Sequence, residues 1–269
     1  MNIGTSINLP SNILPITSNT NSIQIMFSKS NLTIDELKDI KKYINKYKYK
    51  YIHASYQINI GSEIIGINIY NPSYEILLDQ IKYAKYLETD GLILHMGKNV
   101  KNKFENDYIY NNMVKFLLFI FNKMNKLKLN FNILLETPAG QKGDMCFNLY
   151  DFVNFILLFK PTKYYHNINI CIDTCHIFQA GYDLNNLNVI QDIHKIFEPV
   201  KDKIKLIHFN DSANKFNSHL DRHAQIGKGY IKIKNLIKFI EPYKNIPLIL
   251  ETIGPYEKQI KLIKNNFVL

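Results

Sequence analysis

Residues 168–183 read INICIDTCHIFQAGYD, and this stretch decides how the rest of the chain is interpreted. Its first six residues place a β-branched isoleucine at every second position, which predicts a buried strand that ends at Asp173. His176 follows three residues later, so its ring can reach the same end of that strand from the next loop or helix. Two thiols, Cys171 and Cys175, lie in the same stretch. A site of oxygen and nitrogen donors therefore competes with a thiolate metal or redox site.

The same pattern, a short apolar run followed by a longer segment with helical spacing, recurs along the chain. Helical spacing is clearest at residues 34–47, 74–87 and 111–127. Strands alternating with helices in this way are typical of a single (β/α)8 TIM barrel of about 250 residues, in which the active site lies at the carboxyl ends of the strands. No linker divides the chain, so we expect one domain over residues 1–269. The eight predicted strands are 3–7, 22–27, 49–54, 91–96, 131–136, 168–173, 204–209 and 247–252.

Six of these strands end on a potential metal ligand. Residues two apart on a strand face the same way, and each of these polar ends follows a small or apolar neighbour of the same parity, such as Ile93 before His95. Taken singly, a histidine at a strand end is more often a hydrogen-bonded loop anchor than a ligand. Six such ends at one mouth would bury charge unless cations compensate it. The six residues are His53, His95, Glu136, Asp173, His208 and Glu251.

Three further residues enlarge this set. His176 lies beyond the sixth strand, and Asp221 and His223 follow the seventh at a spacing that places both side chains on one face of an extended segment. The result is nine candidate ligands. One zinc ion takes about four ligands, so nine with a bridging carboxylate imply two or three ions. Imidazole with carboxylate suits zinc or manganese better than magnesium or calcium.

Composition limits the remaining choices. The chain has 33 Lys and Arg against 23 Asp and Glu, a formal charge of +10, which favours a polyanionic partner, although a solvated lysine-rich surface explains the charge equally well. The apolar runs are too short to span a membrane, and the N-terminus lacks the pattern of a secretory signal. Three cysteines do not make a disulfide framework. We therefore expect a soluble protein of a reducing, intracellular compartment, where Cys171 packs beneath the ligands and Cys146 is isolated.

Several strings, in order over almost the whole chain, resemble the endonuclease IV family of abasic-site DNA repair nucleases. The resemblance implies a TIM barrel with three zinc ions at its mouth, with manganese as an alternative at one of the sites. The strings are HASYQINIG (53–61), LLETPAGQ (134–141), CIDTCHIFQAGYD (171–183), HFNDS (208–212), DRHAQIGKG (221–229) and PLILET (247–252).

By this resemblance each zinc ion has its own ligands, and Glu136 bridges the first two ions. The first set is His53, His95 and Glu136; the second adds Asp173, His208 and Glu251 to Glu136; the third is His176, Asp221 and His223. Glu136 and Glu251 are expected to be catalytic. The implied reaction is hydrolysis of the phosphodiester 5′ to an abasic site, which leaves a 3′-hydroxyl and a 5′-deoxyribose phosphate, with additional cleaning of blocked 3′ ends.

The implied partner is double-stranded DNA that carries abasic sites or 3′-blocked ends, bound by a monomer. Tyr56 occupies the position of a tyrosine that enters the DNA. Next to it Gln57 replaces an apolar residue of the family, and Lys228 replaces an acidic one between two glycines. The segment 27–31 after the second strand is also shorter than is usual. We expect Tyr56, Gln57 and Lys228 to contact DNA, with a geometry that differs in detail from the family.

Two other functions fit parts of the sequence. A metal-dependent sugar isomerase on a related barrel needs only one or two ions, and the pair Asp221 and His223 together with His176 argues for a third. A nucleic-acid-binding protein without turnover is disfavoured by the intact ligand set. The remaining histidines match no ligand position and are interpreted as surface or loop residues: His166, His194 and His219.

Overall fold

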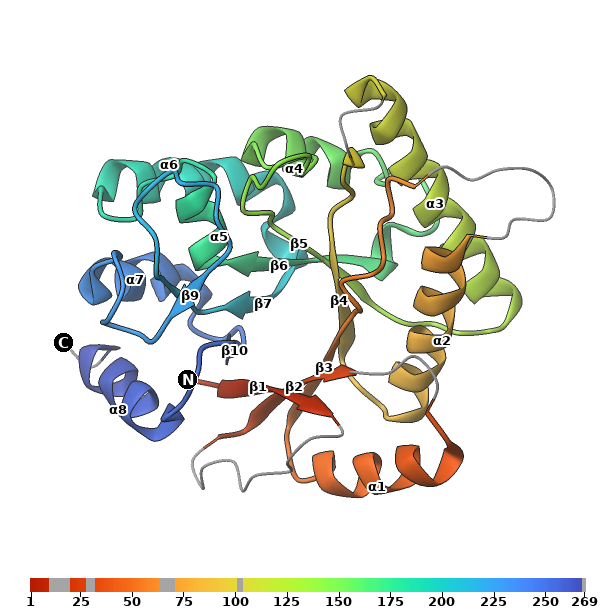
Figure 1. Cartoon of the computed structure of the whole chain (residues 1–269), viewed down its shortest axis with the longest axis horizontal. Coiled ribbons are helices and arrows are strands. Elements are labelled where there is room, and N and C mark those ends of the chain that lie inside the picture. The colour runs from red at the N-terminus through yellow and green to blue at the C-terminus, as the bar shows by residue number, and fades with distance from the viewer. Residues whose placement is uncertain (10–19, 28–31, 63–70, 101–103, 268–269) are drawn as a thin grey trace.

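The fold is a closed barrel of eight parallel strands surrounded by helices (Figure 1). The computed structural model describes residues 1–9, 20–27, 32–62, 71–100 and 104–267. Neighbouring strands follow the order of the chain, and the first strand closes the ring by pairing with the last through Ile3 and Leu248. The predicted TIM barrel is confirmed. The barrel strands are β1 (Ile3–Leu9), β2 (Ser22–Phe27), β3 (Tyr49–His53), β4 (Gly91–His95), β5 (Ile133–Glu136), β6 (Ile168–Asp173), β7 (Ile204–His208) and β10 (Leu248–Leu250).

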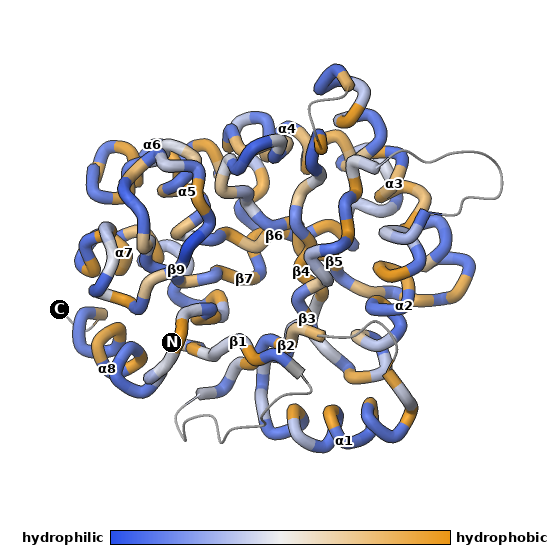
Figure 2. The backbone as a smooth tube through the Cα atoms, in the orientation of Figure 1, coloured by the Kyte–Doolittle hydropathy of each residue, from blue (hydrophilic) through white to orange (hydrophobic). Residues whose placement is uncertain are grey.

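From β2 onward, helices connect the barrel strands and cover the outside of the barrel. Several of them start at a side-chain cap: Thr33 and Glu36 form a capping box before the first helix, and Asn71 caps the second, which has a proline in its first turn. Figure 2 shows orange, hydrophobic residues alternating with blue ones along these helices. The helices are α1 (Ile34–Ile44), α2 (Pro72–Tyr86), α3 (Asn106–Lys126), α4 (Leu149–Leu157), α5 (Thr174–Gln179), α6 (Leu187–Phe197), α7 (Ile233–Ile240) and α8 (Tyr256–Phe267), with short 3-10 turns η2 (Tyr165–Asn167), η3 (Glu198–Lys203) and η4 (Glu241–Tyr243).

Inside the ring, a small apolar layer fills the barrel. We call it the inner layer, and it is separate from the large core between strands and helices. Each of its members stands two residues before one of the six polar strand ends, so alternation along the strands points those polar residues inward as well. The parity predicted from the sequence is confirmed, including the packing position of Cys171. The inner layer consists of Tyr51, Ile93, Leu134, Cys171, Leu206 and Ile249.

A small antiparallel sheet, which the sequence did not predict, lies outside the barrel. Strand β8 (Asp211–Ser212) pairs with β9 (His223–Ala224), with Ser212 opposite His223. The chain between them leaves the mouth of the barrel and returns to it. The pairing therefore brings the Asp221 and His223 segment back to the strand ends.

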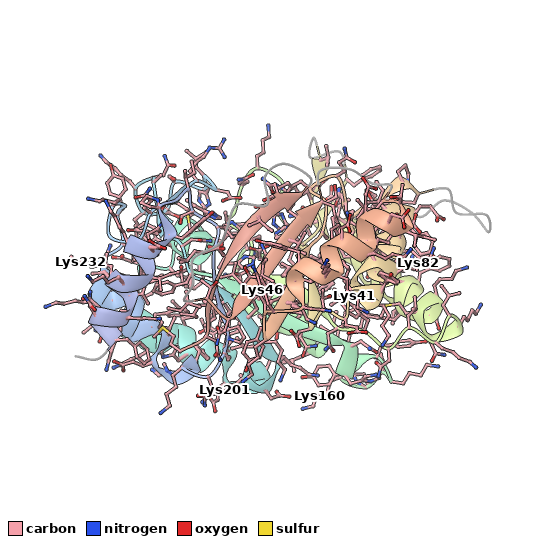
Figure 3. All side chains as sticks on the ribbon, turned by 90° about the horizontal axis from the view of Figure 1, so that it is seen from below. Lys41, Lys46, Lys82, Lys160, Lys201 and Lys232 are labelled. Carbon is pink, nitrogen blue, oxygen red and sulfur yellow. The ribbon has the colours of Figure 1, made fainter. Side chains whose placement is uncertain are left out.

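The positive charge of the chain is widely distributed. Figure 3 looks at the molecule from below and shows labelled lysines spread across its full width rather than gathered in one patch. This arrangement favours a solvated lysine-rich surface for most of the charge. Among the described residues, no helix is both long and apolar enough to cross a membrane.

Candidate metal centre

The strand ends place six polar side chains at the carboxyl mouth of the barrel. His53, His95, Glu136, Asp173 and His208 are the last residues of β3 to β7, and Glu251 follows β10 directly. Most of them are buried: Asp173 and His208 have no exposed surface. Buried ionisable groups at this density require mutual pairing or a cation.

The first group is His53, His95 and Glu136. The Oε2 atom of Glu136 lies 3.3 Å from Nε2 of His53 and 2.9 Å from Nε2 of His95. The Nδ1–H of His53 donates to the carbonyl of Ala54 at 2.8 Å, which directs its Nε2 at Glu136. The three donor atoms lie within 4.8 Å of one another, close enough to hold one ion.

The second group uses the other oxygen of Glu136. Its Oε1 lies 2.7 Å from Nδ1 of His208, which is also 3.1 Å from Oε2 of Glu251 and 3.8 Å from Oδ2 of Asp173. These four residues again offer atoms within 4.8 Å of one another. Glu136 therefore faces both groups, one oxygen to each, as a bridging carboxylate does.

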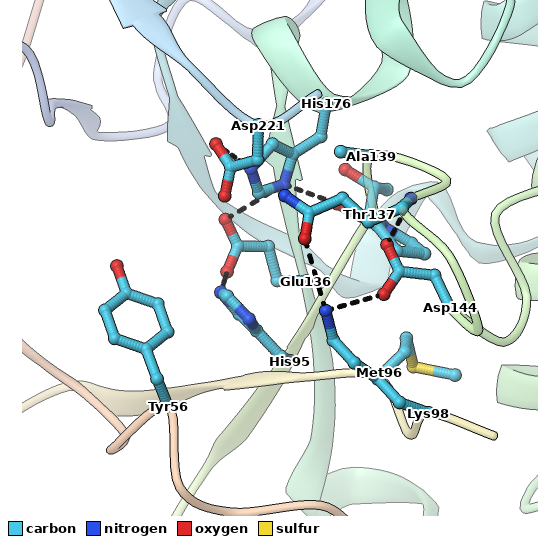
Figure 4. A pocket seen from close by; sticks show the side chains of 12 residues that line it. Tyr56, His95, Met96, Lys98, Glu136, Thr137, Ala139, Asp144, His176 and Asp221 are labelled. Atoms are coloured by element: carbon cyan, nitrogen blue, oxygen red, sulfur yellow. Dashed lines mark hydrogen bonds and ion pairs between the residues drawn. The ribbon is translucent and has the colours of Figure 1, made fainter. Parts of the chain in front are cut away.

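The third group is His176, Asp221 and His223. Oδ1 of Asp221 lies 3.1 Å from Nε2 of His176 and 3.2 Å from Nε2 of His223. Asp173 caps α5 by accepting the backbone N–H of His176 at 2.9 Å, and the Nδ1–H of His176 donates to the carbonyl of Thr137 at 2.9 Å. The first and third groups meet in the cavity shown in Figure 4, where Glu136, His95, His176 and Asp221 converge.

Two nitrogens of the third group have no hydrogen-bond partner among the described residues. The Nε2 atoms of His176 and His223 are buried and close to Asp221, yet neither is aligned for a hydrogen bond. Unsatisfied buried nitrogens are costly. Lone pairs converging on a cation shared with the carboxylate would satisfy them, so the residues present fit a metal ion.

The electrostatics of the cluster point the same way. Burial on its own lowers the pKa of His176, but Asp173 and Asp221 raise it well above its usual value. Burial likewise raises the pKa of Glu136, but His208 and His95 hold it well below its usual value. Without an ion, these shifts favour the imidazolium form of His176 and the carboxylate form of Glu136. A divalent cation would replace those protons as the source of positive charge.

The cysteines also lie within reach of these groups, but their chemistry differs. Cys171 is close to Glu136 and His208, and Cys175 to Asp173 and His223. Burial raises the pKa of the Cys171 thiol to about 12, and it raises that of Cys175 further above its usual value. Each thiol is the only cysteine in its group, without the further cysteines of a thiolate zinc site, so the oxygen and nitrogen donors form the better site.

Comparison with known proteins identifies the family. A family model described as a xylose isomerase-like TIM barrel matches residues 19–266. A probable endonuclease 4 of Mesoplasma florum is 35% identical over 258 residues, which cover 92% of this chain and 83% of that protein. The chain belongs to the endonuclease IV family. A probable endonuclease 4 of Clostridium beijerinckii is 34% identical and covers 87% of this chain.

Solved structures agree on the barrel. Endonuclease IV from Thermus thermophilus matches with a TM-score of 0.74 at 20% identity, covering 100% of this chain and 99% of that one. A D-tagatose 3-epimerase-like protein matches with a TM-score of 0.77 at 17% identity and covers 97% of its own chain. At these identities the matches show the fold alone. The endonuclease IV resemblance read from the motifs is confirmed by the sequence relatives.

Two buried amides that the sequence reading missed hold ligands of the second group. The side-chain amide of Gln24 on β2 donates to Oε1 of Glu251 at 2.7 Å, and its carbonyl accepts from Nε2 of His208 at 2.7 Å. Asn210 donates to Oδ2 of Asp173 at 2.7 Å and to Oε2 of Glu251 at 3.2 Å. Since a carboxylate only accepts hydrogen bonds, the Gln24 nitrogen must face Glu251 and the Gln24 oxygen must face His208. Nε2 of His208 therefore carries the proton in that hydrogen bond, which leaves Nδ1 of His208 available to an ion.

A buried carboxylate holds the loop that follows the third group. Asp211 accepts backbone N–H groups from Ser212, Gly227, Gly229 and Ile231 at 2.8 to 3.1 Å. A side chain at position 229 would collide with the Ser212 carbonyl, so glycine is required there. The sequence shows Asp211 within the string HFNDS, but it does not show the hydrogen-bond partners of Asp211. Most of these partners lie later in the chain and reach Asp211 only because the chain folds back towards it.

The expected DNA-contacting residues lie at the surface of the mouth. Tyr56 is 65% exposed, with its ring 5.3 Å from that of His53 and 5.2 Å from that of His95 (Figure 4). Gln57 is exposed beside it, and Lys228 is exposed on the loop held by Asp211. Residues 28–31, the greater part of the shortened segment after β2, lie outside the described residues.

The three histidines that were interpreted as surface or loop residues lie in different environments. His166 is exposed, as expected. His194 is neither a surface nor a loop residue: it is half-buried in α6, and its Nε2–H donates to the carbonyl of Phe239 at 3.0 Å. His219 lies in a loop against the ring of Phe147 with its Nδ1 buried. The error for His194 arose because helical spacing around it was not recognised.

Proposed function

We propose that this chain is a metal-dependent endonuclease of DNA base excision repair, which hydrolyses the phosphodiester 5′ to an abasic site and leaves a 3′-hydroxyl and a 5′-deoxyribose phosphate. A phosphodiesterase activity that clears blocked 3′ ends would use the same centre. One observation carries the proposal: three adjacent donor groups share a mouth, and Glu136 gives one oxygen to each of the first two groups.

The three groups would hold three zinc ions, with manganese as an alternative at one of them. Their imidazole and carboxylate donors suit these metals, and the unpartnered Nε2 atoms of His176 and His223 support an ion in the third group. Ions bound there would lower the pKa of a water molecule and neutralise charge on the phosphoryl oxygens.

The chain's own residues would position the reacting groups. Glu136 would fix the spacing of the first two groups, because its carboxylate is fully buried between them. Glu251 would accept a hydrogen bond from the attacking water, because Gln24 and Asn210 hold its carboxylate in one orientation at the mouth. Both residues are thus proposed as catalytic.

The substrate side of the mouth supports an abasic nucleotide in double-stranded DNA. The cavity beside the metal centre has a volume of about 250 Å³ and is lined by Tyr56 as well as by Glu136 and His176. An abasic nucleotide leaves the stack at low cost because no base pair has to be broken. Tyr56, exposed above His53 and His95, would fill the space left in the duplex, with Gln57 and Lys228 contacting the strands. We propose a monomer acting without a membrane partner.

A sugar isomerase or epimerase is the second candidate, since such enzymes share this barrel. The third group argues against it, because Asp221 and His223 lie on a segment outside the barrel that β8 and β9 bring to the mouth. A centre for one or two ions has no need of them. A binding protein without turnover is disfavoured because all nine proposed ligands are present and close together.

The decisive experiment uses duplex DNA with one tetrahydrofuran abasic analogue, which cannot undergo β-elimination. Zinc-loaded protein should cut it on the 5′ side and leave an extendable 3′-hydroxyl. No incision would refute the proposal.

A variant ties the reaction to this centre. Glu251→Gln should lower the incision rate by about a thousandfold while DNA affinity changes little, because removal of a group that acts on the reacting atoms costs this order of rate. Glu257→Gln on the exposed face of α8 is the matched control. If Glu251→Gln retained full activity, Glu251 would not belong to the catalytic centre.

A further inference from the structure

The cavity at the metal centre has a second end that none of the proposed ligands occupies. Glu136 and His176 line one end, and Lys98, Gln141 and Asp144 line the other. Figure 4 shows Lys98 and Tyr56 on either side of His95. A group bound to the metal centre would therefore have neighbours that extend towards Lys98.

The backbone of Lys98 is held rigidly. Its N–H donates to Oδ1 of Asn59 at 2.8 Å, and the Asn59 amide donates back to the Lys98 carbonyl at 3.0 Å. Lys98 also forms an isolated antiparallel bridge with Asp144, with the N–H of Asn99 on the carbonyl of Gly143 at 2.8 Å. Gly143 has φ +85° and no room for a side chain against Asn99, so this contact requires glycine.

The side chain of Lys98 is also fixed. Its Nζ lies 2.9 Å from Oδ1 of Asp144, whose side chain is only 7% exposed, and 3.5 Å from Oε1 of Gln141. The other oxygen of Asp144 accepts the backbone N–H of Gln141 at 2.8 Å, so the carboxylate cannot turn away. Many other lysine ion pairs of the described residues are exposed pairs three residues apart on a helix, such as Lys82 with Asp79.

We propose that Lys98 binds a phosphate of the incised DNA strand, namely the phosphate next to the phosphodiester that is cut. Asp144 and Gln141 are the residues that position Lys98. This inference rests on the proposed function. An ammonium group has three donors, and two are directed at Asp144 and Gln141, so the third is available to an anion. A lysine held in place loses little side-chain entropy on binding, which makes it a better phosphate contact than a mobile surface lysine.

The alternative is an ion pair that only closes the wall of the cavity. The two roles predict different effects of removing Asp144. If Lys98 contacts phosphate, Asp144→Asn keeps an amide oxygen that can accept from Nζ and removes the negative charge that competes with phosphate, so DNA affinity stays equal or rises. If the pair is only structural, Asp144→Asn and Lys98→Met weaken binding alike through the same disturbance of the loops.

The experiment measures the Kd for the tetrahydrofuran duplex at several salt concentrations, with Glu251→Gln in every protein so that the DNA stays uncut. Lys98→Met should raise the Kd roughly three- to tenfold and reduce the slope of log Kd against log salt by about 0.9, the value for one lost phosphate contact. Lys98→Arg should keep the slope. Lys160→Met is the control, because Lys160 is exposed just after α4, which places it at the face opposite the mouth.

The outcomes separate the inference from the function on which it rests. An unchanged Kd and slope for Lys98→Met, or an Asp144→Asn variant that weakens binding as much as Lys98→Met, would overturn the role of Lys98. This holds even if the unsubstituted chain, with Glu251 intact, incises DNA. If the unsubstituted chain fails to incise, the proposed function is refuted. The slopes of the binding experiment still report on Lys98 in that case.

Discussion

Replacing Gln24 by leucine should weaken both the fold and the second donor group. Gln24 is fully buried and joins His208 to Glu251 through two hydrogen bonds of 2.7 Å. Leucine has a similar volume but neither donor nor acceptor, so both partners are left unsatisfied. A buried hydrogen bond to a charged group contributes about 1.5–3 kcal/mol, and one between neutral groups about 1 kcal/mol, so we expect a loss of about 2–4 kcal/mol in the free energy of unfolding.

The loss should also appear in metal binding. Residues that orient ligands typically change metal affinity by about 10- to 100-fold when they are removed. Urea denaturation of the metal-free protein gives the first effect, with the midpoint lowered by about 1 M if the slope is about 3 kcal/mol per M. Competition with a chromophoric chelator gives the second, and should show one ion weakened more than the others.

A matched control is present in the same chain. Gln80 on α2 is also buried, but among the described residues its side chain makes one hydrogen bond, accepting the backbone N–H of Ser55 at 3.0 Å, and makes none with a proposed ligand. Gln80→Leu should cost about 1 kcal/mol and leave chelator competition unchanged. If Gln24→Leu and Gln80→Leu had equal effects on metal affinity, the orienting role of Gln24 would be refuted.

Three further predictions concern other parts of the structure. Asp211→Asn should lower the free energy of unfolding by about 3 kcal/mol, because the amide can serve only some of the four N–H donors; a loss below about 1 kcal/mol in urea would contradict this. Burial lowers the pKa of His194, so its folded form resists protonation while the unfolded chain takes up a proton near pH 6.5. The destabilisation caused by His194→Asn should therefore shrink between about pH 7.5 and pH 5.5, and a constant difference would show that His194 is not the group responsible. Elemental analysis of the purified protein should find three metal ions per chain, and fewer than two would argue against the proposed centre.

Much of the barrel could be read from the sequence because its rules are local. Alternation along a strand requires only neighbours in sequence, so Ile93 and His95 on β4 reveal their common direction without any knowledge of the fold. Parallel strands joined by helices then bring all carboxyl ends to one mouth. The positions of Glu136 and His208 followed from these two rules alone.

The supports of the centre could not be read in this way. Gln24 lies within an apolar strand, and its partners stand 184 and 227 residues away in the chain. The positions of Asp211 and His223 depend on a small sheet of two strands with two residues each, and no local sequence pattern predicts that these strands pair. A side chain that orients another side chain is determined by residues that lie close in space but far apart in the sequence. A single sequence therefore shows the proposed metal ligands more readily than the residues that hold them in place.

The shared carboxylate of Glu136 would couple two of the proposed metal sites. Its two oxygens belong to one rigid group, so an ion bound at Oε2 would also hold Oε1 in its direction towards His208. The free energy of orienting the carboxylate would then be required only once for the two ions, and linkage would make this benefit mutual. Removal of either ion would, on this account, weaken the binding of the other.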